Sequence, residues 1–203
     1  MREMLPQLAF TLPATGRLDP WALFGEPRRP IWLEIGFGAG EHLAAQAEHH
    51  REKGFIGCEV FENGIARFLG QAESRKLRNV RVFPDDARQL LGALPPASIH
   101  RVFILFPDPW PKRRHHKRRI VSRETLDVLA VIMTDGSELR LATDEPDYLA
   151  WMLERIAQHR SFEWLARHRR DWCERPSDWP PTRYEQKARA AGRSLAFLRF
   201  VRR

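Results

Sequence analysis

The chain has 203 residues, of which 43% are hydrophobic and 30% are charged, and it contains seven tryptophans and twelve phenylalanines. This length suits one domain with a sizeable hydrophobic core, and the composition excludes intrinsic disorder and fibrous repeats. The apolar runs are too short for a membrane helix and the first residues lack a signal-peptide core, so we expect a cytoplasmic protein without a membrane segment.

The positive charge is concentrated in two zones, although the formal net charge is only +8. Residues 109–123 carry seven basic side chains and no acidic one, and residues 154–203 carry 13 basic and six acidic ones. Between them, residues 124–153 carry seven acidic side chains and one basic. Such segregation indicates a polyanionic partner held at two places, most simply a nucleic acid. Taken alone, a short basic run is more often a solvated loop.

Regular patterns begin after an irregular amino-terminal arm, residues 1–29, which holds four prolines and no sustained periodicity. Residues 30–203 are expected to form a single domain. The predicted strands are Ile31–Ile35, Gly54–Val60, Val80–Phe83, Arg101–Phe106, Ser137–Ala142, Phe162–Ala166 and Leu195–Val201. The predicted helices are Glu41–His49, Ile65–Lys76, Ala87–Leu91, Arg123–Met133 and Pro146–Gln158. This alternation predicts an α/β fold with a mostly parallel sheet, helices on both faces and an antiparallel edge.

The sequence offers little for a metal site. Cys58 and Cys173 lie too far apart along the chain to suggest a thiolate pair or a disulfide framework, so we expect two reduced thiols. His115 and His116 have no third ligand at a useful spacing. We therefore expect no metal, and we expect these histidines to contact RNA.

A glycine-rich turn, Gly36-Phe-Gly38-Ala-Gly40, follows the first predicted strand and precedes a helix. In an open parallel sheet this turn is a ligand site, because glycines let the backbone approach a bound molecule closely. A dinucleotide fingerprint would place its third glycine where this chain has Glu41, and a carboxylate there would oppose a pyrophosphate. The turn therefore favours S-adenosylmethionine, which has an adenosine, no phosphate, and cationic sulfonium and ammonium groups.

Carboxylates stand at the ends of three successive predicted strands. Glu34 would attract the cationic groups of the ligand, Glu59 would accept hydrogen bonds from the ribose hydroxyls, and Asp86 would accept one from the adenine amino group. Each residue alone could be a helix cap or a surface residue. Together with the glycine turn they predict a cofactor site.

The segment after the fourth predicted strand, residues 107–119, combines rigidity with charge. Three prolines surround Asp108 and Trp110 and restrict the backbone before any ligand binds. The segment starts at the carboxyl end of a central strand, beside the expected crevice, so Asp108 also counts among the cofactor-binding residues. An acid and an indole next to a methyl donor, followed by six Lys and Arg residues, suit a nucleobase bound with its phosphates.

The motif Asp108-Pro-Trp-Pro-Lys112, followed by His115 and Lys117-Arg118-Arg119, resembles the signature of the bacterial tRNA (guanine-N7-)-methyltransferases. The chain departs from that family at Tyr184, where phenylalanine is usual, and at Arg193, where histidine is common. Other matching pieces are Leu23-Phe24-Gly25, Leu33-Glu34-Ile35-Gly36-Phe37-Gly38 with Gly40, Asp86-Ala87, Thr143-Asp144, and Thr182-Arg183-Tyr184-Glu185 with Lys187 and Gly192.

The resemblance implies a Rossmann-like class I methyltransferase fold with seven mostly parallel strands and an antiparallel edge strand. It also implies methyl transfer from S-adenosylmethionine to N7 of a guanine in the variable loop of tRNA, by a monomer or a homodimer. Because N7 carries a lone pair and no proton, Asp108, the implied catalytic residue, would orient the base and balance charge without removing a proton.

Guanine recognition is expected from carboxylates that face its N1–H and amino donors, with Asp144 and Glu185 as the candidates. An N-cap role competes for Asp144, and a surface ion pair competes for Glu185 and Arg183. The further substrate-binding residues that the resemblance implies are Lys112, Thr182, Arg183 and Tyr184. The implied RNA-binding residues are Arg113, Arg114, His115, Lys117, Arg118 and Arg119.

Three other functions stay open at this point. An RNA-binding module without catalysis would explain the basic zones but would leave Glu34, Glu59 and the glycine turn without a role. A methyltransferase acting on an exocyclic amine of RNA has a related motif after its fourth strand, but its substrate would need a proton removed. An NAD-linked oxidoreductase is disfavoured by Glu41.

Overall fold

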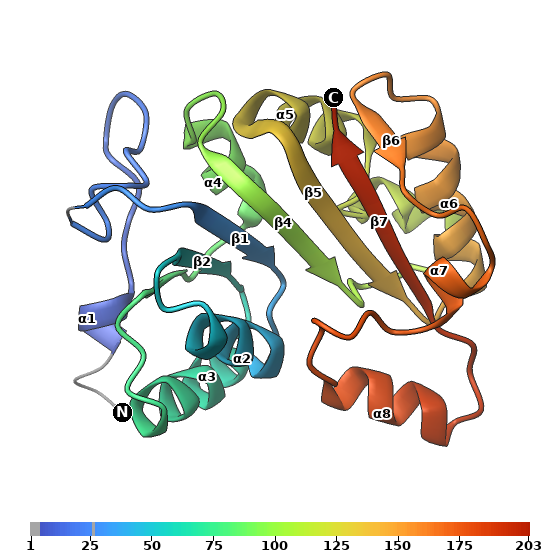
Figure 1. Cartoon of the computed structure of the whole chain (residues 1–203), viewed down its shortest axis with the longest axis horizontal. Helices are drawn as coiled ribbons and strands as arrows, with labels where there is room; N and C mark the ends of the chain where they lie inside the picture. Colours follow the sequence, from blue (N-terminus) through green and yellow to red (C-terminus); the bar gives the residue numbers. More distant parts are fainter. Residues whose placement is uncertain (1–4, 26) are drawn as a thin grey trace.

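The computed structural model describes residues 5–25 and 27–203. Within these residues, seven strands form one sheet in the order β3-β2-β1-β4-β5-β7-β6 (Figure 1). The strands are β1 (Ile31–Ile35), β2 (Gly54–Cys58), β3 (Val80–Phe83), β4 (Ile99–Leu105), β5 (Met133–Thr143), β6 (Phe162–Trp164) and β7 (Ala196–Arg202). Strands β1 to β5 pair in parallel, which confirms the predicted mostly parallel sheet.

The antiparallel strand lies one position inside the edge. β7 pairs antiparallel with both β5 and β6, so β6 forms the edge itself. β6 is only three residues long. A short edge strand offers few unpaired backbone groups to other chains.

Helices cover both faces of the sheet (Figure 1). Successive side chains of a strand point to opposite faces. Leu33 and Ile35 pack in the core cluster that includes α4, α5 and α6, whereas Trp32 packs in the cluster that includes α2 and α3. These helices are α2 (Glu41–His49), α3 (Glu62–Ser74), α4 (Ala87–Ala93), α5 (Arg123–Ile132) and α6 (Pro146–Ala157).

The ends of the parallel strands are level with one another. Ile35 at the end of β1 pairs with Cys58 of β2 and with Ile104 of β4, and Cys58 pairs with Phe83 of β3. The turns that follow these strands therefore meet at the carboxyl edge of the sheet. The chain runs from β1 through β2 to β3 on one side, and then crosses back to β4 on the other side of β1. The direction of strand addition therefore reverses at β1. In open α/β sheets, ligands bind at such a switch point.

The carboxyl-terminal segment contains two helices that the sequence did not predict, α7 (Arg170–Cys173) and α8 (Arg183–Ala190). Trp179 and Ala188 of this segment form a third apolar cluster with Ala142 of β5 and Phe197 of β7. This segment therefore packs on the sheet through Trp179 and Ala188.

The amino-terminal arm carries one short helix, α1 (Leu5–Leu8), instead of being irregular throughout its described part. Ala9 forms an isolated parallel bridge with Val82, and the Phe10 amide donates to the Val82 carbonyl at 3.0 Å. The arm thereby caps the exposed edge of β3. Among the residues that the structure describes, no helix is long and apolar enough to span a bilayer.

Candidate active site

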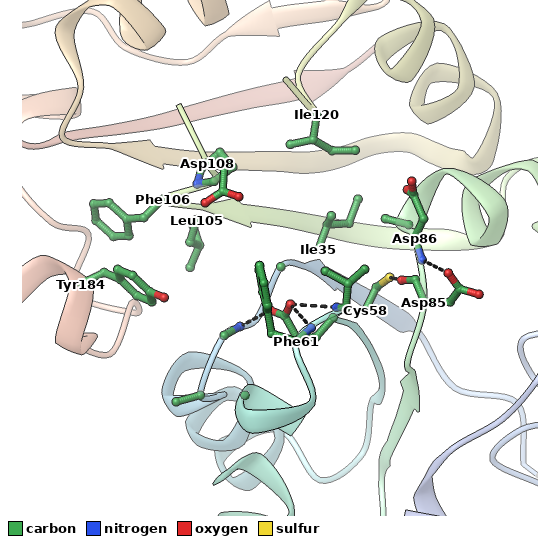
Figure 2. Close-up of a pocket in the computed structure, with 18 of the residues that line it drawn as sticks. Ile35, Cys58, Phe61, Asp85, Asp86, Leu105, Phe106, Asp108, Ile120 and Tyr184 are labelled. Atoms are coloured by element: carbon green, nitrogen blue, oxygen red, sulfur yellow. Dashed lines mark hydrogen bonds between the residues drawn. The ribbon is translucent and has the colours of Figure 1, made fainter. Parts of the chain in front are cut away.

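A cleft of about 440 Å³ opens at the carboxyl ends of β1 to β4. Eight of the predicted site residues line it, namely Gly36, Gly38, Glu59, Asp86, Asp108, Arg118, Arg183 and Tyr184. In Figure 2 the Asp108 carboxylate and the Tyr184 hydroxyl point into the space that Phe61 and Asp86 border from the other side. The cleft thus joins the strand ends to the carboxyl-terminal helix α8.

The glycine turn needs its glycines for two different reasons. Gly36 and Gly38 have φ angles of 72° and 57°, which side chains with a Cβ rarely adopt. Gly40 has a φ of 79°, and a Cβ there would meet the Phe68 ring at 2.4 Å. Gly40 is buried and is not part of the cleft lining. Gly40 therefore allows the close packing of α2 on α3, and its predicted contact with the cofactor stays a prediction.

Glu59 holds the turn in place. Its Oε2 accepts a hydrogen bond from the Gly38 amide at 2.7 Å, and its Oε1 accepts from the amides of Val60 and Phe61 at 2.8 and 3.0 Å. Three backbone donors thus fix a carboxylate that is 5% exposed and that lines the cleft. The carboxylate links the turn after β1 to the turn after β2.

Asp86 caps α4 and lines the cleft at the same time. Its Oδ1 accepts from the Arg88 amide at 2.9 Å, and its side chain pairs with the Arg88 guanidinium. The preceding Asp85 also borders the cleft and was not predicted. The sequence left two interpretations of Asp86 open, a helix cap and a ligand-binding residue. The structure is compatible with both.

An apolar wall of the cleft was missed from the sequence. Val60 and Phe61, directly after Glu59, line the cleft and are 54% and 64% exposed. Large exposed apolar side chains at the mouth of a concave site are suited to a flat ring system. The sequence could have indicated these two residues, because they directly follow Glu59 at the end of β2.

The loop that follows β4, residues 106–110, has a constrained backbone, and we call this loop the Asp108 hairpin. Phe106 and Trp110 adopt left-handed φ angles of 51° and 44°. Bulky residues in this region cost about 1–3 kcal/mol each and persist only where surrounding contacts enforce them. Asp108 between them is exposed and lines the cleft. The hairpin therefore presents this carboxylate to the cleft with little freedom.

A 3-10 helix, η1 (Arg113–Arg118), follows the hairpin. The Arg118 guanidinium lies 4.8 Å from the centre of the Trp110 ring, and the His115 ring meets the same indole edge-on at 5.9 Å. Of the six predicted basic residues around this helix, five are exposed to solvent beside the cleft, namely Lys112, Arg113, Arg114, Lys117 and Arg118. Arg119 is the exception, because it is 1% exposed and its side chain points into the interior.

Helix α8 closes one side of the cleft. A Cβ on Gly38 would lie 3.2 Å from the Tyr184 ring, so this tyrosine stands over the glycine turn. The Arg183 side chain pairs with Glu41 at 2.5 Å. The Thr182 hydroxyl caps the helix by accepting from the Glu185 amide at 3.2 Å.

Asp144 and Glu185, the two residues predicted to recognise guanine, lie outside the cleft lining. Each forms ion pairs with arginine. Asp144 pairs through Oδ2 with Arg193 at 2.7 Å. Glu185 is 4% exposed, and Arg175 and Arg189 both donate to its Oε1. Arg193 is the residue at which this chain departs from the family pattern, and here it ties the segment before β7 to the turn after β5.

Glu34 also lies outside the cleft lining. Its carboxylate is 4% exposed and is hydrogen-bonded to His42 Nδ1 at 2.7 Å. The neighbouring Gln46 donates to the Asp178 carbonyl at 2.7 Å. Glu34 thus belongs to a buried polar chain that joins β1 and α2 to the carboxyl-terminal segment, and its predicted contact with the ligand stays a prediction.

Cys58 borders the cleft, and its thiol donates to the Asp85 carbonyl at 3.0 Å. Burial raises the pKa of this thiol well above its ordinary value, and the charges of Glu59 and Asp86 add to the effect. The thiol is thus a neutral structural group. Within the described part of the chain, no group of three or more His, Cys, Asp or Glu side chains could hold a metal ion.

The comparisons with known proteins agree with this geometry. A protein-family model described as "Putative methyltransferase" matches residues 28–198. The chain is 50% identical to the tRNA (guanine-N(7)-)-methyltransferase of Rhodospirillum rubrum, over 98% of this chain and 80% of that protein. It is also 50% identical to the enzyme of the same name from Paramagnetospirillum magneticum, over 100% of this chain and 85% of that protein.

Solved structures extend the likeness of the fold to more distant proteins. The 16S rRNA methyltransferase KamB superposes with a TM-score of 0.60 at 15% identity, over 93% of this chain and 96% of that chain. The strand order with its antiparallel β7 is that of the class I methyltransferases. With half of its residues identical to two curated relatives along nearly its whole length, the chain belongs to the tRNA (guanine-N7-)-methyltransferase family.

Proposed function

We propose that this chain transfers the methyl group of S-adenosylmethionine to N7 of a guanine in the variable loop of tRNA. The observation that carries the proposal is the position of Asp108, which a constrained hairpin presents to a glycine-lined cleft directly beside a solvent-exposed basic helix. This arrangement puts a methyl-donor site, a base-orienting acid and a phosphate-binding surface next to one another.

The cleft fits the methyl donor. Glu59 and Asp86 would hold the ribose and the adenine amino group, and the exposed Val60 and Phe61 side chains would cover the purine ring. The tight turn at Gly36 and Gly38 would admit the methionine portion close to the backbone. The bound molecule supplies a sulfonium methyl group, which is already activated for displacement by a nitrogen lone pair.

The protein contributes position and charge in this reaction. Guanine N7 carries no proton, so no general base is required. Asp108 would orient the purine and balance the positive charge that moves onto the ring during transfer. Alignment of the two reactants can lower the barrier by up to about 7–11 kcal/mol, so orientation is the largest contribution that the hairpin can make.

Guanine selection would depend on the turn after β5, which holds Asp144, and on α8, which holds Glu185. The arginine partner of Asp144 contacts its Oδ2, and the two arginine partners of Glu185 both contact its Oε1. The other oxygen of each could accept from the N1–H and amino donors of guanine after a local movement of α8. The exposed Tyr184 ring could stack on a base that has left its neighbours, with Thr182 and Arg183 shaping the same side.

The tRNA backbone would lie along the exposed basic residues of segment 112–118. Phosphate contacts of this kind set affinity and salt dependence more than base choice. A tRNA substrate supports a cytoplasmic location for the enzyme.

Labelled S-adenosylmethionine and unmodified tRNA test the proposal directly. We expect incorporation of the label, recovery of 7-methylguanosine after nuclease digestion, and strand cleavage at the modified guanine after reduction and aniline treatment. Labelled product that resists this cleavage would indicate an exocyclic amine as the acceptor. Binding of tRNA without any incorporation, together with no heat of binding for S-adenosylmethionine, would indicate a binding module.

A further inference from the structure

Arg119 ends the basic segment but differs from the other basic residues in its surroundings. It is 1% exposed, whereas Lys117 and Arg118 beside it are exposed. A phosphate in solution cannot reach a guanidinium group at that depth without displacing the groups that cover it. The charge of Arg119 must therefore be balanced by groups of the protein itself.

The guanidinium group has partners on two elements. Its Nε donates to the carbonyl oxygen of Pro109 at 2.8 Å, and its Nη2 donates to the carboxylate of Asp147 at the start of α6. Its carbon Cζ lies 4.8 Å from the centre of the Tyr148 ring and 5.0 Å from that of Trp151. Arg119 thus bridges α6 to the carbonyl group directly after Asp108.

The two rings are themselves fixed to the backbone that follows Arg119. The Tyr148 hydroxyl accepts from the Val121 amide at 3.3 Å, and the Trp151 indole donates to the Val121 carbonyl at 2.6 Å. Tyr148 is fully buried, and its burial raises its pKa to about 12, so the ring stays neutral. The planar guanidinium therefore lies in a preformed site with a defined orientation.

We propose that Arg119 is a positioning residue, which holds the Asp108 hairpin against α6, and that it is not a ligand of RNA phosphate. The hairpin needs such a contact because Phe106 and Trp110 both keep left-handed backbone angles. Arg119 touches neither reactant and acts through Pro109 on the direction of the neighbouring carboxylate. The inference rests on the proposed function, because it assigns Arg119 a role in placing Asp108 for that reaction.

Arg119→Lys is the informative variant, because lysine keeps the charge and loses the planar fork that reaches Pro109 and Asp147 together. We expect kcat to fall about tenfold or more, since small misplacements of a reacting group are costly. The KM for tRNA should stay within about twofold, and the slope of log affinity against log salt should not change. The matched control is Arg78→Lys, an exposed arginine outside the cleft lining and outside both basic zones, which should behave as the wild type.

A second measurement does not depend on activity. Hydrogen exchange of the peptide covering residues 105–112 should be faster in Arg119→Lys than in the wild type and in Arg78→Lys. Asp147→Asn should also speed this exchange, by a smaller factor, and it provides the same test if the lysine variant does not fold. The Asp147 side chain is 70% exposed, so its replacement leaves the core intact.

The outcomes separate the two hypotheses. Unchanged kcat together with unchanged hairpin exchange would overturn the positioning role, and so would a raised KM for tRNA with a salt slope reduced by about one unit, which is the signature of a lost phosphate contact. A wild-type protein that methylates no tRNA would contradict the proposed function alone. Hairpin exchange would in that case still decide whether Arg119 holds the hairpin.

Discussion

Asp108, which we propose orients the reacting base, contributes no side-chain hydrogen bond to the described part of the fold. It is exposed, and none of the described residues donates a hydrogen bond to its carboxylate. Asp108→Ala should therefore change the free energy of unfolding by less than about 0.5 kcal/mol. Loss of a charge-balancing group at the reacting base should lower kcat by about 100-fold or more.

Methyl transfer to tRNA, calorimetric binding of S-adenosylmethionine and thermal unfolding together check this prediction. Binding of the methyl donor should stay within about threefold of the wild type, because one carboxylate among several contacts changes its affinity little. Glu73→Ala, an exposed acid at the end of α3, is the control and should retain full activity. Equal activity of Asp108→Ala and the control would remove Asp108 from the reaction.

Gly40 tests the packing of the glycine turn. Gly40→Ala combines a φ of 79° with a Cβ that would meet the Phe68 ring at 2.4 Å. Left-handed strain and overpacking should together lower the free energy of unfolding by at least about 2 kcal/mol. Gly70→Ala in α3, where a Cβ has no neighbour within 4 Å, should raise it by about 0.5–1 kcal/mol. Denaturant titration measures both, and similar effects in the two variants would contradict the packing argument.

The basic helix η1 is the element that should set the salt dependence of RNA binding. Lys117 is exposed on it and has no partner among the described residues. Lys117→Ala should weaken tRNA binding and reduce the slope of log affinity against log salt by about one unit, because one fewer counterion is released. The affinity for S-adenosylmethionine should not change.

Filter binding at several salt concentrations measures this slope. Arg51→Ala is the matched control, because Arg51 is exposed in the loop between α2 and β2, at the opposite edge of the sheet from the cleft. It should leave the slope unchanged. Equal slopes for Lys117→Ala and the wild type would mean that Lys117 does not contact a phosphate.

The predictable elements are those with strong local patterns. β1, β3 and α2 have the predicted bounds, because apolar runs form the two strands and the glycine turn separates β1 from α2. Helix α8 was missed because its outward face is polar and only Ala188 and Glu185 are buried in it. Its available signal was Thr182-x-x-Glu185, which has the form of a capping box. The packing of Trp179 that supports this helix depends on contacts far along the chain.

The sequence also predicted some site residues better than others. Gly36, Glu59 and Asp108 were predictable because each lies within three residues of the end of a strand that borders the cleft. Glu34 and Arg119 have equally suggestive neighbours in sequence, yet both are buried among residues of other elements. Their surroundings depend on how α2 and α6 pack, which no local pattern specifies. A charged motif thus identifies a region better than it identifies the role of each member.

The stability of the whole molecule should decrease in acid in two windows. Burial lowers the pKa of His100, whose Nδ1 accepts a hydrogen bond from the Ile31 amide at 3.2 Å and is therefore unprotonated. Below pH about 6.5 the unfolded chain takes up a proton that the folded chain resists, so this contribution falls as the pH falls. Burial raises the pKa of Glu138, but hydrogen bonds from Arg199 and Arg140 outweigh that effect and leave it below its ordinary value. Stability from this pair is lost below pH about 4.5.

Non-titrating variants should separate these two windows in thermal unfolding curves between pH 8 and pH 3 (about the range in which His and Glu titrate). In His100→Gln the amide oxygen can still accept from Ile31, so the loss between pH about 7 and 5 should become shallower. Glu138→Gln should flatten only the loss at lower pH, because its folded-state pKa is depressed. His168→Gln, at an exposed position, should follow the wild type. A His100→Gln curve parallel to the wild type throughout would show that this imidazole does not link folding to pH, and that the upper window has another origin.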